Sequence, residues 1–176
     1  MRTPRASYDR EEAGVNPERG LRTSVLGKKR KSAKTFCVFN RTRDSFLSLG
    51  VRLTDTHWSR LRGLVGKVRL RGDEGIWVVP SQGVHTIGVL FPVDLIYLDE
   101  EDRVVQLEES FGTFRIGPVR TNCASVLELP TRTIYSSQTQ VGDQLLICRP
   151  DVMEEFFRNR ELALKATAAD ASAGSP

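Results

Sequence analysis

The sequence is poor in the residues that build metal sites and disulfide scaffolds. It has three cysteines and two histidines among 176 residues, and the cysteines form no C-x-x-C pair. This scarcity argues against a disulfide-rich scaffold or a Cys/His zinc module, although one disulfide between two of the cysteines stays compatible with the sequence. We expect reduced thiols in or beside the core.

Long apolar runs are also missing. No window approaches the roughly 18 apolar residues of a membrane-spanning helix. Residues 1–10 are too polar for a secretory signal. We therefore expect a cytoplasmic protein that does not cross a membrane.

Familiar catalytic fingerprints are absent as well. The sequence contains no Gly-x-Ser-x-Gly elbow, phosphate-binding loop or dinucleotide-binding motif. We therefore expect no cofactor, and the sequence favours a non-catalytic protein over an enzyme.

Positive charge is concentrated in the first part of the chain. Residues 1–34 carry ten Lys or Arg and four Asp or Glu, a net of +6, out of totals of 26 and 22. The remaining sixteen basic and eighteen acidic residues give 35–176 a net of −2. The polar composition predicts a disordered basic tail over 1–34. Its cluster Lys28, Lys29, Arg30 and Lys31 either contacts nucleic acid, another anionic polymer or a membrane surface, or only adds solubility.

Apolar periodicity predicts a β-rich α+β fold. Strands are expected at 35–39, 45–53, 76–79, 84–86, 94–98, 103–108, 125–129 and 144–148. One short internal helix is expected at 56–64. Because the strands mostly lack helical crossovers between them, we predict a compact, mainly antiparallel, barrel-like sheet. The predicted organisation is a single β-rich domain over 35–150, a C-terminal helix over 151–166 and a disordered tail over 167–176.

An ordered set of short motifs runs through the central part of the chain. These are Arg62-Gly-Leu64, His85-Thr86, Phe91-Pro-Val-Asp94, Leu95-Ile-Tyr-Leu-Asp99, Arg103-Val-Val105, Ser125-Val-Leu-Glu-Leu-Pro130 and Val141-Gly-Asp143. In this order and spacing, residues 45–148 resemble the uncharacterised prokaryotic family called domain of unknown function 192. The resemblance implies a compact β-rich domain with a short helix, and it implies no activity. Two departures from the family pattern are Gly88-Val-Leu90, where a methionine is usual, and Thr131-Arg-Thr133, where a glycine is usual.

His85 is the strongest single candidate for chemistry. Its imidazole could act as a base or a metal ligand, with Asp94 or Glu128 in support, which would make the protein a hydrolase-like enzyme. Alternatively, His85 is a half-buried residue whose ring fixes the turn at Phe91-Pro92, a bond whose cis or trans state the sequence leaves open. No second histidine lies at ligand spacing, so the sequence favours the structural interpretation.

Four polar residues interrupt the apolar strands and define the candidate ligand-binding site. They are His85, Thr86, Asp94 and Arg115. Asp94 opens an apolar run, which predicts that its carboxylate accepts hydrogen bonds from backbone N–H groups at the start of a strand. Our first hypothesis is a non-catalytic domain that binds a protein partner or a small ligand and carries a flexible basic arm.

Overall fold

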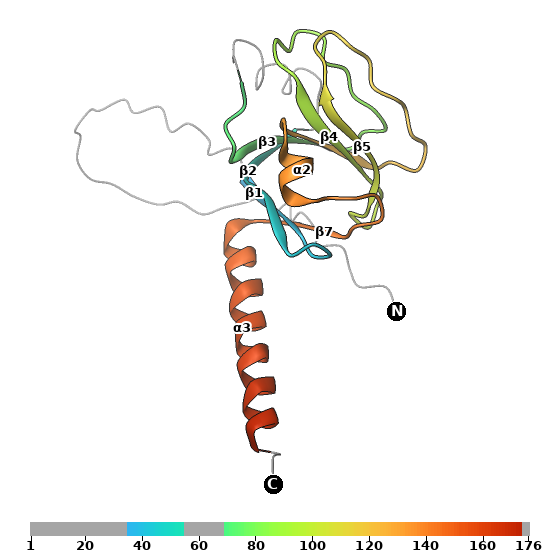
Figure 1. Ribbon diagram of the computed structural model, residues 1–176. Coiled ribbons are helices and arrows are strands. Elements are labelled where there is room, and N and C mark those ends of the chain that lie inside the picture. Colours follow the sequence, from blue (N-terminus) through green and yellow to red (C-terminus); the bar gives the residue numbers. More distant parts are fainter. Residues whose placement is uncertain (1–34, 55–68, 174–176) are drawn as a thin grey trace, which may run out of the picture. The chain divides into compact units, whose positions relative to one another are not determined.

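Alternating and continuous apolar segments form one curled sheet in the computed structural model, which describes residues 35–54 and 69–173. The strand order is β5-β4-β6-β3-β2-β1-β7, and the sheet curls into a half-barrel (Figure 1). All neighbouring strands are antiparallel except β2 and β3. The prediction of a mainly antiparallel, barrel-like sheet is therefore confirmed. The strands are β1 (Thr35–Asn40), β2 (Ser45–Thr54), β3 (Glu74–Val78), β4 (Val93–Leu98), β5 (Val104–Phe111), β6 (Ser125–Pro130) and β7 (Leu145–Cys148).

Some predicted elements differ from the structure. The strand expected at 84–86 is only a single antiparallel bridge between His85 and Ile116, since the chain turns away at Gly88, where φ is 85°. The helix expected at 56–64 and the tail at 1–34 lie outside the described residues. The structure adds the helix α2 (Thr133–Ser137), which is too short to leave an apolar period in the sequence.

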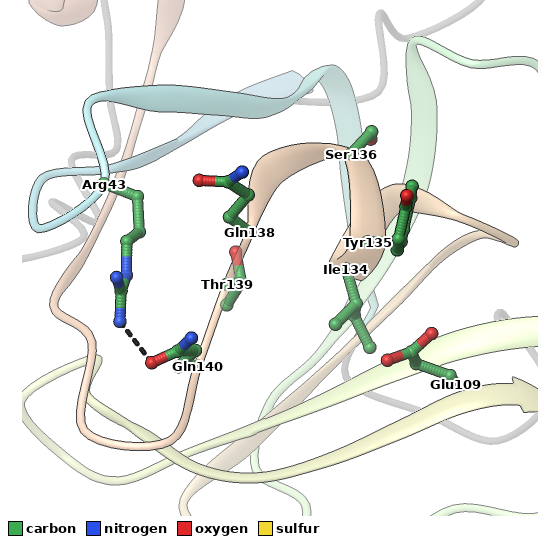
Figure 2. A pocket seen from close by; sticks show the side chains of 8 residues that line it. All are labelled: Arg43, Glu109, Ile134, Tyr135, Ser136, Gln138, Thr139 and Gln140. Carbon is green, nitrogen blue, oxygen red and sulfur yellow. Dashed lines mark hydrogen bonds between the residues drawn. The ribbon is translucent and has the colours of Figure 1, made fainter.

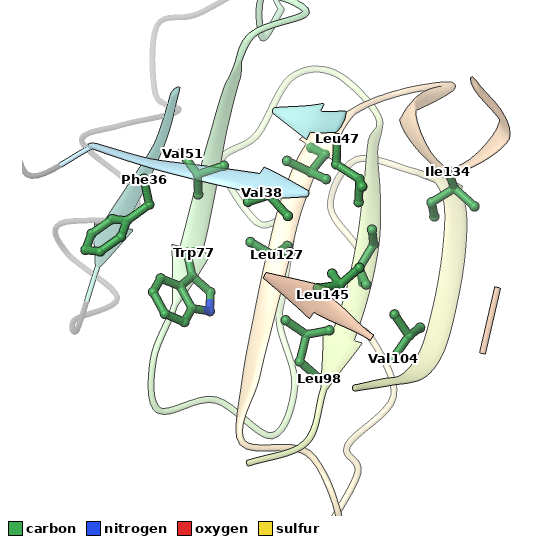
Figure 3. Packing of buried hydrophobic residues seen from close by; sticks show 12 residues of the cluster. Phe36, Val38, Leu47, Val51, Trp77, Leu98, Val104, Leu127, Ile134 and Leu145 are labelled. Atoms are coloured by element: carbon green, nitrogen blue, oxygen red, sulfur yellow. The ribbon is translucent and has the colours of Figure 1, made fainter. Parts of the chain in front are cut away.

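The first core lies against one face of the curled sheet. Side chains from all seven strands and α2 converge there, and most are completely buried (Figure 3). Ile96 and Leu98 of β4 meet Leu127 and Leu129 of β6 in this core. At about 25 cal/mol per Å² of apolar surface removed from water, this burial is the main stabilising contribution to the fold.

The opposite face of the same strands is buried as well. Leu95 and Tyr97 point to this side, because successive side chains of a strand alternate between faces. The segments that follow β3 and β5 cover them. Gly117 allows this covering, because a Cβ there would lie 2.7 Å from the Tyr97 hydroxyl oxygen and 3.1 Å from the Val84 carbonyl oxygen. Burial, followed by nearby Glu108, raises the pKa of Tyr97 to about 12.

The C-terminal helix α3 (Pro150–Ala173) packs on the outside of β1 and β7. Its Met153 forms a small third cluster with Cys37 and Phe39, and Phe157 stacks edge-on against Phe39 at 5.0 Å between ring centroids. The helix continues seven residues past the predicted end at 166, because Ala-rich residues have high helix propensity.

The three cysteines are free thiols. Cys37 and Cys148 are register partners across β1 and β7. Burial, followed by the neighbouring Cys37, raises the pKa of Cys148 to about 11. Burial also raises the pKa of Cys37. Both thiols therefore stay protonated near neutral pH, the form that reacts slowly in disulfide exchange.

Asp143 joins the two edge strands of the sheet. Two backbone hydrogen bonds link the strands at this point. The Val104 N–H donates to the Asp143 carbonyl oxygen at 2.9 Å, and the Leu145 N–H donates to the Asp102 carbonyl oxygen at 3.0 Å. The Asp143 carboxylate accepts hydrogen bonds from Asn40 Nδ2 at 2.9 Å and from Arg43 Nε at 3.1 Å. Burial of this carboxyl opposes ionisation, but these donors and the Arg43 charge outweigh it and lower its pKa.

We predict that Asp143→Asn lowers the free energy of unfolding by about 2 kcal/mol at pH 7, because the buried donors lose a charged acceptor. The folded-state pKa lies below its ordinary value of 3.8. The carboxylate's stabilisation is therefore fully present above that value and is lost as the pH falls through the folded pKa. Urea unfolding at pH 7 and at pH 3 measures the difference.

The matched control is Asp151→Asn, whose carboxylate pairs with Arg149 on the surface and should matter little. A difference between wild type and Asp143→Asn that stays constant from pH 7 to pH 3 would contradict this assignment.

Candidate binding surface

Asp94 is completely buried, and its carboxylate binds the C-terminal end of β5. Its Oδ1 accepts the Ser110 N–H at 2.9 Å, and its Oδ2 accepts the Ile134 N–H at 3.0 Å. The second bond caps α2, whose own N-cap residue Arg132 supplies no side-chain bond. Both carboxylate oxygens thus accept backbone N–H groups, as predicted, but these groups belong to the end of β5 and to α2 and not to the start of a strand.

Thr86 is also completely buried, and it holds residues 112–115 of the loop that follows β5. Its hydroxyl donates to the Gly112 carbonyl oxygen at 2.7 Å and accepts the Arg115 N–H at 2.9 Å. The Thr86 backbone adds a bond from its own N–H to the Arg115 carbonyl oxygen at 2.8 Å and accepts the Phe114 N–H at 3.1 Å. One side chain and its peptide groups therefore determine the path of residues 112–115.

The loop held by Asp94 and Thr86 has an unusual backbone. Ser110 has φ of 50° and Phe114 has φ of 54°. Left-handed φ costs an L-residue roughly 1–2 kcal/mol, and a bulky aromatic residue rarely adopts it. The Phe114 side chain is nevertheless 63% exposed, and the next apolar residue, Ile116, is 77% exposed.

His85 and Arg115 belong to the same loop system. His85 is half-buried and lies directly opposite Ile116 in an antiparallel bridge. Two backbone hydrogen bonds flank that bridge, from the Thr86 N–H to the Arg115 carbonyl oxygen and from the Gly117 N–H to the Val84 carbonyl oxygen. His85 and Ile116 are therefore a non-hydrogen-bonded pair, the type in which the two side chains lie closer together. The Arg115 side chain is exposed while its peptide groups are fixed by Thr86. The four candidate residues therefore all contact or belong to residues 110–116.

The structure does not form the His85–Asp94 pair that hydrolase chemistry would use. Asp94 alternates with Leu95, so its carboxylate faces the first core and α2. His85 belongs to the segment over the opposite face, where Val84 is buried. Glu128 is fully buried in β6. It lies two residues after Val126, so both side chains point to the His85 side of the sheet.

The loop and the segment hydrogen-bonded to it carry several exposed apolar side chains. We call this set of side chains the loop surface. Its members are Ile87 (50%), Leu90 (65%), Phe114 (63%), Ile116 (77%) and Val119 (69%). Isolated exposed apolar residues are normal, but several on adjoining segments mark contact surfaces. The sequence could have revealed them, because the apolar residues after Phe111 belong to no predicted strand.

A separate pocket of about 660 Å³ lies between α2, β5 and the β1–β2 turn (Figure 2). Its lining is mostly amide and hydroxyl groups, and its cation, Arg43, already binds Asp143 and Gln140. Glu109 lies on the facing strand. The pocket thus offers no uncommitted charge of its own to a ligand beyond Glu109.

Two further features bear on the possible chemistry. Among residues 35–54 and 69–173, no group of three or more His, Cys, Asp or Glu side chains is arranged to hold a metal ion. None of the helices in the described part of the chain is long and apolar enough to cross a membrane.

Comparison with known proteins agrees on the fold. The model of the family DUF192, described as Uncharacterized ACR, matches residues 38–147. A protein of unknown function from Novosphingobium aromaticivorans is similar in structure, with a TM-score of 0.54, 17% identity and coverage of 64% of this chain and 83% of its own. A candidate transcription regulator from Sinorhizobium meliloti has a TM-score of 0.52, 20% identity and coverage of 64% and 91%. At these identities the likeness shows the fold alone. Among curated proteins, no relative matches the chain.

We predict that Thr86→Val lowers the free energy of unfolding by about 2–3 kcal/mol, because it leaves the Gly112 carbonyl and the Arg115 N–H without their partner. Thr86→Ser keeps the hydroxyl and should cost only about 1 kcal/mol for the lost methyl group. Chemical unfolding of the two variants measures the contrast. Equal losses would show that the hydroxyl does not hold the loop.

Phe114→Asn should raise the free energy of unfolding by up to about 1 kcal/mol, since Asn tolerates left-handed φ and little Phe packing is lost. Arg132→Asn is the matched control, because Arg132 is exposed with φ of 72° and has no proposed contact role. Thermal and urea unfolding report both. A clear loss of stability in Phe114→Asn alone would mean that Phe114 serves the fold.

Proposed function

The chain belongs to the uncharacterised family DUF192, whose model matches residues 38–147, and we propose that it is a non-catalytic binding domain that uses the loop surface. The family assigns no activity, so the proposal rests on the geometry of this chain. Phe114, Arg115 and Ile116 make the central contacts. His85, Thr86 and Asp94 position them.

The exposed ring and left-handed backbone of Phe114 are the main support for the proposal. Its exposed ring gains little from burial within the chain, and its φ of 54° costs stability. Strained backbone of this kind concentrates at binding and catalytic sites, where the surrounding structure enforces it. Contact with a partner would bury the ring and offset that cost.

The loop is also organised before binding. Buried groups bind the peptide groups of Ser110, Gly112, Phe114 and Arg115. A partner would therefore meet a fixed surface and would not have to order a flexible one, which reduces the entropic cost of association.

The alternative of a His-based or metal-dependent hydrolase receives less support. A general base and its orienting group need hydrogen-bond reach of one another. Asp94 is occupied by two backbone donors and lies on the other side of the sheet from the segment that holds His85. Glu128 lies on the His85 side, but its side chain is completely buried and therefore inaccessible to a substrate. His85→Ala should therefore chiefly lower the melting temperature.

We infer a prokaryotic, cytoplasmic protein in which the β-rich domain acts together with the basic arm around Lys28–Lys31. The charge of that arm supports an auxiliary electrostatic contact that adds to the loop surface.

The test is site-specific photo-crosslinking of the full chain in the cells that produce it. A benzophenone amino acid replaces either Phe114 or Tyr135, an aromatic residue that is even more exposed, at 76%. We expect a discrete adduct from position 114 and none from position 135. The captured molecule is then purified, and its Kd is measured with the wild type and with Phe114→Asn/Ile116→Thr.

The double variant should bind at least about tenfold more weakly, because hot-spot contacts dominate binding free energy. Tyr135→Ser should bind like the wild type. Equal adducts from both positions, or an unchanged Kd in the double variant, would overturn the proposal.

A further inference from the structure

We propose that the loop surface docks on an anionic lipid bilayer, a choice of partner that rests on the binding function proposed above. The proposal concerns peripheral contact with the interface between headgroups and acyl chains. Two observations define it, the chemistry of the exposed side chains and the distribution of charge around them.

The exposed side chains are aliphatic or benzyl. Ile87, Leu90, Phe114, Ile116 and Val119 are between 50% and 77% exposed, and they come from two segments that are hydrogen-bonded to one another. Such side chains gain free energy by entering the boundary between headgroups and acyl chains. They gain little in a nucleic-acid groove, where phosphate contacts dominate affinity.

The charge on these segments has one sign. Residues 75–93 and 110–127 contain no Asp or Glu. The exposed Arg115 and Arg120 supply positive charge beside the apolar side chains. The acids that border these two segments in the sequence are Glu74, Asp94, Glu109 and Glu128, of which Asp94 and Glu128 are completely buried. An anionic membrane surface attracts such exposed cations at short range.

The backbone of the loop also suits a bilayer interface. Peptide groups that enter an apolar region need internal partners, because lipid supplies none. Thr86 satisfies Gly112 and Arg115, and Asp94 satisfies Ser110. A bond from the Arg120 N–H to the Gln82 carbonyl oxygen at 2.8 Å joins the segments further along. An acidic protein would also suit the two arginines, but the exposed aliphatic side chains of Ile87, Leu90, Ile116 and Val119 favour lipid.

The test is flotation of the full chain with vesicles of phosphatidylcholine alone or mixed with phosphatidylglycerol. We expect binding to the mixed vesicles, weakened by salt because exposed charges are screened. Phe114→Asn/Ile116→Thr should lower the partition coefficient at least about tenfold. Arg115→Gln/Arg120→Gln should lower it as well, and Tyr135→Ser should leave it unchanged.

A second readout separates the loop from the basic arm. Phe114→Trp places a fluorophore at the loop, and the emission of Trp58 and Trp77 in the wild type is subtracted. Lipids brominated on the acyl chain should quench Phe114→Trp and spare Tyr135→Trp. All four residues Lys28–Lys31 changed to Gln should leave this quenching in place.

Each outcome decides one of the two proposals. Quenching at 114 together with loss of flotation in the double variant supports membrane docking. Flotation that is lost when Lys28–Lys31 are changed to Gln, but is unaffected in Phe114→Asn/Ile116→Thr, overturns membrane docking. If no vesicle binds but the position-114 adduct is a protein whose Kd is weakened by the double variant, membrane docking fails and the binding function stands. If neither vesicle nor adduct depends on the loop, both fail.

Discussion

Two buried polar side chains, Asp94 and Thr86, determine the conformation of the loop that follows β5. Asp94 binds the Ser110 N–H from one side of the sheet, and Thr86 binds Gly112 and Arg115 from the other. A buried polar group without a partner costs about 1–3 kcal/mol. Each of these two side chains is therefore satisfied only when the loop follows this path, with left-handed φ at Ser110 and Phe114.

The need to satisfy buried polar groups explains why polar residues stand within apolar segments, where the sequence alone also suggests a catalytic site. Both faces of β4 are buried, so a polar residue there must be fully bonded. The available partners are the peptide groups of irregular segments, namely α2 and the loop. The polar residues thus support a surface whose exposed part is aromatic, aliphatic and cationic, and the function proposed for the protein follows from that exposed part.

Much of the fold could be predicted because its signals are local. The apolar runs at 94–98 and 103–108 predict two strands with no helical crossover between them, and β4 and β5 pair antiparallel as expected. The place of Asp94 at the start of the first run predicts that its carboxylate accepts backbone N–H groups, as it does. These features depend on residues close together in sequence, where alternation and turn chemistry operate.

Other features depend on contacts between distant residues and could not be predicted. The link between β5 and β7 depends on Asp143 meeting Asn40, 103 residues away in the chain. The α2 helix has five residues, and its cap comes from Asp94 in another element. Left-handed φ at Phe114 contradicts the residue's own preference, so only the tertiary contacts of Thr86 can impose it.

The same holds for the candidate site. His85, Thr86, Asp94 and Arg115 were identified as polar interruptions, and their common relation to residues 110–116 appears only in three dimensions. The exposed apolar side chains were missed because apolar residues are expected inside a fold. A run without Asp or Glu, divided by Gly and Pro and outside any strand, is the sequence signal that indicates them.

Asp94 and Thr86 fix the loop in the free protein. Amide hydrogen exchange of the full chain, resolved by residue, measures this directly. We expect the Ser110 and Arg115 amides to exchange as slowly as those of β4, and Thr86→Val to accelerate exchange at Arg115 without affecting β4. Exchange of both amides at the rate of the exposed turn at Glu100 would show that the two side chains do not fix the loop.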